Sequence, residues 1–222
     1  SIKKPQLSNT KAHLYKQLLA SLRLIKTQES IDLQLHEQLD YARILYNKGL
    51  YMQSLKIIEK AKELAIEHNQ DSFLIQAISL EKKIEILHIT RSMQDRADRL
   101  SIEANEINAK RIMITRLSNL ALQLYSWYIK NGHARNEKDE AGIKKFFREQ
   151  LPPHAFKLTG FYERLYLYQS YCWFAFIRQD FLMYYRYAQK WVDIFKAEPL
   201  MIRVETGHYI KGLHTLLNAH FD

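Results

Sequence analysis

Residues 41–65, YARILYNKGLYMQSLKIIEKAKELA, contain two helical patterns separated by a glycine turn. After the glycine, apolar or small residues occupy positions 54, 57, 58, 61, 64 and 65, the spacing of a helix with one buried side. Before it, a second such stripe is formed by Leu35, Leu39, Ala42 and Leu45. Gly49 can end the first helix because glycine accepts the left-handed backbone conformation. Helices joined by so short a turn must lie antiparallel, so the stretch predicts a helical hairpin.

This hairpin resembles a tetratricopeptide repeat. That family follows the pattern W-x2-L-G-x2-Y, then A-x3-F, then a small residue and Pro, over about 34 residues. The positions that match in kind are Gln38, Tyr41, Ala42, Leu45, Ser54, Ile58 and Ala61. The small residues Ala42, Ser54 and Ala61 fall where the two helices of such a hairpin cross closely. The sequence departs from the pattern at Gln38 for Trp, at Ala42 for Gly and at Ile66 for Pro.

Helical patterns continue through the rest of the chain, with weaker matches to the repeat. We expect the best unit over residues 35–68, further units over about 72–108, 109–150 and 160–196, and a final helix over about 199–220. The joint between the second and third units is expected at residues 105–108. The resemblance implies an all-α fold, an α-α superhelix of stacked antiparallel hairpins with about ten helices. Residues 1–222 would form a single helical repeat domain, part of a longer protein.

Composition supports a helical class. The chain has only 6 Gly and 4 Pro, too few turn-forming residues for many short strands. Its single cysteine, Cys172, rules out an intramolecular disulfide and any site built from paired cysteines. No apolar run is long enough for a membrane span, so we expect no membrane association and a cytoplasmic location.

The net charge of +9 raises the question of nucleic acid. Basic residues are spread along the whole chain and are interleaved with acids, whereas a surface that follows a phosphate backbone gathers them on one face. A solvated basic surface is the favoured interpretation. A basic helical-repeat domain that binds nucleic acid stays open as an alternative.

No motif of catalysis is present. The sequence lacks a glycine-rich phosphate loop, a G-x-S-x-G elbow and an H-E-x-x-H pair. Among the nine histidines, His208, His214 and His220 recur every six residues, which scatters them around a helix. Cys172 is expected to be a buried, inert thiol. We therefore expect a protein that is not an enzyme and needs neither metal nor cofactor.

Residues 161–195 contain about half of the chain's aromatic residues. Aromatic side chains bury large areas in a core, and they also dominate the anchors of protein interfaces. Because they are too many for one helical stripe, the segment is either all core or partly an exposed aromatic patch.

The resemblance to tetratricopeptide repeats also suggests where a partner binds. In that family the first helix of each hairpin lines a concave groove. The corresponding groove candidates here are His36, Arg43, Tyr46, Asn47, Asn119, Tyr125, Tyr166, Gln169 and Trp173. The Lys, Asn and Arg set with which some members clamp a terminal carboxylate is not reproduced.

The favoured function is a non-catalytic interaction or scaffold module that binds an internal peptide segment or a folded partner protein. Two alternatives stay open. One is nucleic-acid binding. The other is a sensory or dimerisation segment of a larger regulator, which would form a homodimer.

Overall fold

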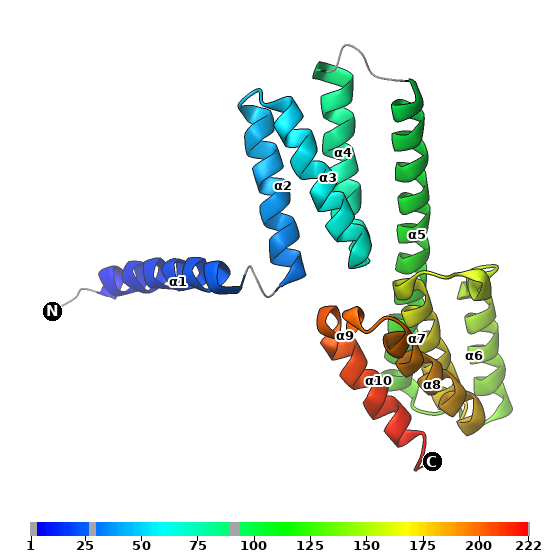
Figure 1. The fold of residues 1–222 in the computed structure, drawn as a ribbon. Coiled ribbons are helices and arrows are strands. Elements are labelled where there is room, and N and C mark those ends of the chain that lie inside the picture. Colours follow the sequence, from blue (N-terminus) through cyan, green and yellow to red (C-terminus); the bar gives the residue numbers. More distant parts are fainter. Residues whose placement is uncertain (1–3, 27–29, 89–93, 222) are drawn as a thin grey trace. The chain divides into compact units, whose positions relative to one another are not determined.

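A computed structural model describes residues 4–26, 30–88 and 94–221. Within these ranges the chain forms ten α-helices, one short 3-10 helix and no strand (Figure 1). The prediction of an all-α fold with about ten helices is confirmed. The chain divides into two compact units, Ser1–Met93 and Gln94–Asp222, and each is described by itself.

Unit 1 contains α1 (Lys4–Lys26), α2 (Ile31–Asn47), α3 (Tyr51–Glu67) and α4 (Asp71–His88). Helix α3 packs against both α2 and α4, and α2 also contacts α4. Gly49, with φ +76°, turns the chain between α2 and α3, in the left-handed conformation that the sequence indicated for this position. The predicted hairpin is therefore present, and a third helix continues it.

The small residues of the hairpin lie at the contact between α2 and α3. Ala42 and Ser54 are fully buried, and Ala61 is 1% exposed. The Ser54 hydroxyl donates a hydrogen bond of 2.8 Å to the carbonyl oxygen of Ala42 in the facing helix. Larger side chains at these positions would hold the two helices apart, because interiors are packed to crystal-like density.

Helix α1 has a different environment. Its side chains over residues 7–24 are all exposed, including Leu14, Leu18 and Leu22. An ion pair of 3.5 Å joins Arg23 to Asp40 of α2. None of the helices in the described ranges is both long enough and apolar enough to cross a membrane.

Unit 2 contains seven helical segments, whose bounds are α5 (Gln94–Asn131), α6 (Glu137–Gln150), the 3-10 helix η1 (Ala155–Lys157), α7 (Phe161–Ile177), α8 (Phe181–Ala197), α9 (Leu200–Val204) and α10 (Thr206–Asn218). Helix α7 packs against α5 and α8, and α8 also contacts α10. The core of the unit is rich in aromatic side chains, with Phe161 and Phe195 almost fully buried. The rings of Tyr171 and Tyr187 stack within it, with centroids 4.2 Å apart.

Two expectations about helix bounds are wrong. No joint occurs at residues 105–108, because α5 runs unbroken for 38 residues; no Gly or Pro within it could stop the helix. The boundary expected at 108/109 thus falls inside α5. The final helix is divided into α9 and α10 at Glu205, whose backbone leaves the helical region at φ −122° and ψ 46°. The Glu205 carboxylate accepts a 2.7 Å hydrogen bond from the Tyr162 hydroxyl, which holds this bend against α7.

The buried contact between α2 and α3 predicts the effect of Ser54→Leu. The larger side chain overpacks the contact and removes the hydrogen bond to Ala42, so we expect a loss of about 1–3 kcal/mol in unfolding free energy. Denaturant unfolding followed by circular dichroism measures it. The neighbouring Gln53→Leu, at an exposed position, is the control and should leave the midpoint almost unchanged. Equal midpoints for the two variants would contradict the close crossing.

Candidate functional site

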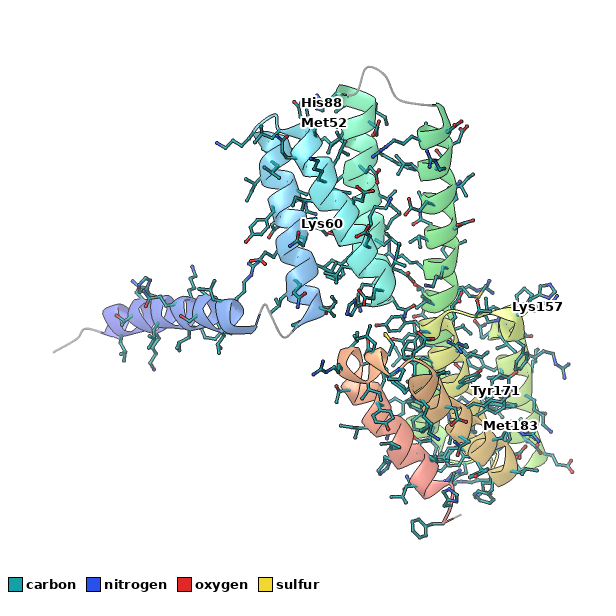
Figure 2. The ribbon with its side chains drawn as sticks, in the orientation of Figure 1. Met52, Lys60, His88, Lys157, Tyr171 and Met183 are labelled. Atoms are coloured by element: carbon teal, nitrogen blue, oxygen red, sulfur yellow. The ribbon has the colours of Figure 1, made fainter. Side chains whose placement is uncertain are left out.

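A cavity of about 420 Å³ lies inside unit 2. Side chains of α5, α7, α8 and α10 line it, and these helices are drawn with their side chains in Figure 2. This volume is within the range of small-molecule sites and of pockets that receive bulky side chains. The cavity therefore gives unit 2 a place where a ligand group could be enclosed.

One wall of the cavity is aromatic. Trp173 and Phe176 stand three residues apart on α7 and so share a face of that helix. Tyr128 of α5 lies 5.7 Å from Trp173 and 5.1 Å from Phe176 between ring centroids, and Tyr184 of α8 lies 5.3 Å from Phe176. These distances are those of favourable aromatic pairs. The four rings thus form a continuous surface that suits a flat apolar group.

The loop after α5 holds the end of this wall in place. Gly132, with φ +72°, ends α5, and the following residues turn toward the C-terminus of α7. The Ala134 amide donates to the carbonyl oxygen of Ile177 at 2.8 Å, and His133 Nδ1 lies 2.8 Å from that of Phe176. Hydrogen bonds to the last carbonyl groups of a helix fix its end. These contacts therefore tie the residues that follow α5 to the end of α7 that carries Phe176 of the aromatic wall.

The opposite wall belongs to α10 and is polar. His208, Lys211 and Thr215 follow one another at helical spacing on this wall. Gln169 of α7, which is 9% exposed, donates a 2.9 Å hydrogen bond from Nε2 to His208 Nδ1. In the neutral ring this leaves the proton on Nε2, which lies 3.8 Å from Glu205 Oε2. The side chain of Lys211 is exposed, and no ion pair or hydrogen bond of its ammonium group is found in the described part of the chain.

The floor of the cavity includes Trp191 of α8. Its side chain is 4% exposed, and its indole N–H has no hydrogen-bond partner among the residues that the structure describes. A Cβ at Gly212 of α10 would lie 3.0 Å from Nε1 and 3.1 Å from Cδ1 of this ring. A side chain at position 212 would therefore have to push the Trp191 ring or α10 back by a few tenths of an ångström. The unsatisfied buried donor costs the folded state roughly 1–3 kcal/mol.

The candidates that the sequence pointed to in unit 2 fall in and around the cavity. Gln169 and Trp173 line it. Tyr125 and Tyr166 stand next to it, with ring centroids 5.0 Å from Trp173 and 5.8 Å from His208 respectively. Burial, and then the charge of Glu205, raise the pKa of Tyr166, so this phenol stays neutral. Asn119 is exposed on α5 and is not part of the lining.

The candidates of unit 1 lie mainly along α2 where it contacts α4. The His36 ring is 4.7 Å from the Phe73 ring, Arg43 donates to Gln76 at 3.3 Å, and the hydroxyl of Tyr46 lies 3.3 Å from His88 Nε2. Arg43 also bonds Asp40. Asn47 is exposed at the end of α2. These side chains pair with their neighbours in unit 1, and none lines the cavity.

Sequence reasoning missed the polar wall and the floor. Trp191 was only one member of the aromatic segment, and Lys211 carried no signal. The six-residue spacing of His208 and His214 was interpreted as scatter, yet both line the cavity. A six-residue step does turn the helix, but the cavity borders α10 over several turns and so meets both. The glycine at position 212 in a helical pattern was the available signal of close packing.

The site offers neither a reactive thiol nor a metal cluster among the described residues. Cys172 reaches the lining but is 3% exposed, and burial raises the pKa of its thiol far above the usual range, which disfavours the reactive thiolate. Across the described ranges, no three His, Cys, Asp or Glu side chains gather in a group that could hold a metal ion.

The burial of Cys172 predicts its reactivity. We expect the folded protein to react with a disulfide reagent at pH 8 much more slowly than a free cysteine does, since its thiol is neutral and covered. The measurement is the release of thionitrobenzoate over time. The control is the same chain in concentrated guanidinium chloride, where one equivalent should react rapidly. Fast labelling of the folded protein would contradict the burial of Cys172.

The comparisons with known proteins add no relative: no family model matches the chain, and neither the curated proteins nor the solved structures contain a match.

Proposed function

We propose that this protein is a non-catalytic interaction module that resembles tetratricopeptide arrays. In this proposal its second unit binds an extended segment of a partner protein across α7 and α10. The observation that carries the proposal is the cavity between these helices, with its aromatic wall and with Lys211, which has no ion pair among the described residues. The order of the helices supports it too, because α7 and α8 form a hairpin and α10 follows as the next long helix.

The composition of the lining fits partner binding. A few aromatic or basic side chains carry most of the free energy of a protein interface, and they do so in well-packed, desolvated pockets. Trp173, Phe176 and Tyr128 are half-buried, so they keep surface that a partner can still cover. Lys211 is exposed at the edge and can steer a segment of opposite charge.

Unit 1 supports the same class of function. Its α2–α3 hairpin carries small buried residues at the positions where tetratricopeptide hairpins cross, including Ala42 and Ser54. Such arrays present extended surfaces because each repeat contacts only its neighbours. We propose a scaffold role for this unit, with the specific contacts made in unit 2.

A random peptide library displayed on phage and selected against the full chain tests the proposal. We expect enriched peptides that bind the wild-type chain and lose affinity by about 2 kcal/mol or more with Trp173→Ala, because that ring is the largest half-buried anchor of the wall. Leu182→Ala, which truncates a side chain that is 72% exposed on α8, is the control and should bind normally.

Thermal unfolding of both variants shows whether Trp173→Ala stays folded, and Lys211→Glu provides a second change at an exposed position. A selection that yields no peptide, or peptides indifferent to Trp173→Ala and Lys211→Glu, contradicts the proposal. Retention of single-stranded RNA on filters at low salt, abolished by added salt, would favour nucleic-acid binding instead.

A further inference from the structure

We infer that the cavity selects an anionic group attached to a flat apolar body. The inference rests on the proposed function in taking this cavity as the binding site, and it adds the chemical class of the bound group. In a partner protein this chemistry is an acidic residue beside a large apolar one. A free aromatic carboxylate offers the same chemistry as a small molecule.

The charges around the cavity favour an anion. No Asp or Glu side chain belongs to the lining, whereas α10 contributes the ammonium group of Lys211 and two imidazole rings. Glu205 lies beside His208, but its carboxylate is already engaged. It accepts a hydrogen bond from the Tyr162 hydroxyl and lies 3.8 Å from His208 Nε2. A carboxylate near Lys211 would thus meet a cation that has no competing ion pair in the described residues, and charge-assisted hydrogen bonds are the stronger ones.

The neutral polar groups of the cavity offer nothing that prefers a cation. The N–H of Trp191 is buried and unpaired, and Trp indole can only donate. Gln169 already uses its amide nitrogen on His208, so it offers only its carbonyl oxygen and one remaining N–H. Neither group carries a charge that could attract a cation. The lining also holds no acidic side chain, and this disfavours cationic ligands.

The aromatic wall specifies the rest of the ligand. Trp173, Phe176 and Tyr128 offer ring faces and edges at one side of the cavity, and this side lacks charge. A flat apolar group gains both burial and aromatic pairing there. The volume of about 420 Å³ admits a bicyclic ring together with its carboxylate.

The probes are 1-naphthylacetate and its neutral counterpart 1-naphthylacetamide, which keeps the same ring and one acceptor oxygen. Each is titrated into the full ¹⁵N-labelled chain, and the indole N–H signals of the three tryptophans are followed by NMR. We expect the acid to bind roughly three- to tenfold more tightly than the amide, because the Lys211 ammonium group attracts its carboxylate. The Trp191 signal, identified by its loss in Trp191→Phe, should shift with both probes.

Two variants separate charge from apolar contact. Lys211→Met should remove the preference for the acid over the amide, while Lys157→Met, at an exposed position outside the lining, should keep it. Trp191→Phe should weaken both probes by roughly two- to tenfold, because a smaller phenyl ring replaces the indole in the floor of the cavity. Trp127→Phe, which changes the half-buried tryptophan outside the lining, is its control.

The outcomes distinguish this inference from the proposed function. Equal binding of acid and amide, or no shift of the Trp191 signal with either probe, overturns the inference. Peptides selected by the wild-type chain that need Trp173 but carry no acidic residue also overturn it, while the proposed function stands. Naphthylacetate binding that depends on Lys211, without any selected peptide, supports the inference for a free carboxylate and removes the proposed function.

Discussion

The packing of α7 between α5 and α8 is the constraint on which the second unit depends. Buried side chains lie around most of this helix, including Leu165, Ala175 and Ile177, which are completely covered. A helix that is apolar on nearly every side has to be enclosed by neighbours. Through α7, the long α5 and the α8 hairpin partner become one body, to which α6 and the short α9 are attached. The aromatic wall of the cavity is the part of α7 that this enclosure leaves partly uncovered.

Helix α10 completes the unit in a different way. It contacts α8, and Gly212 of α10 lies against the ring of Trp191. Because α10 is attached mainly through α8, space remains between its polar face and α7. The cavity exists for this reason, and it combines an aromatic wall from α5, α7 and α8 with a polar wall from α10. The close approach at Gly212 leaves the Trp191 N–H unpaired, which weakens the folded state.

Much of the fold could be predicted from particular residues. Gly49 and the small residues Ala42 and Ser54 indicated the α2–α3 hairpin, since a left-handed turn and a close crossing leave few choices of residue. The prediction of a joint at residues 105–108 failed. Tertiary contacts as well as local signals limit the length of a helix, and nothing local stops α5. Its polar residues Asn105 and Asn108 are exposed, where a helix tolerates them at little cost. The division at Glu205 depends on a hydrogen bond to Tyr162, 43 residues away, which periodicity cannot show.

By itself the sequence determined the helical class, the α2–α3 hairpin and the burial of Cys172, because these follow from spacing, glycine conformation and side-chain polarity along a short stretch. Gln169 and Trp173 could be proposed as binding residues from their place on the first helix of a hairpin. Only the tertiary structure decided that they share a cavity with Trp191, His208 and Lys211. That grouping depends on how closely α10 approaches α8, and such a distance between helices is set by contacts among residues far apart in the chain.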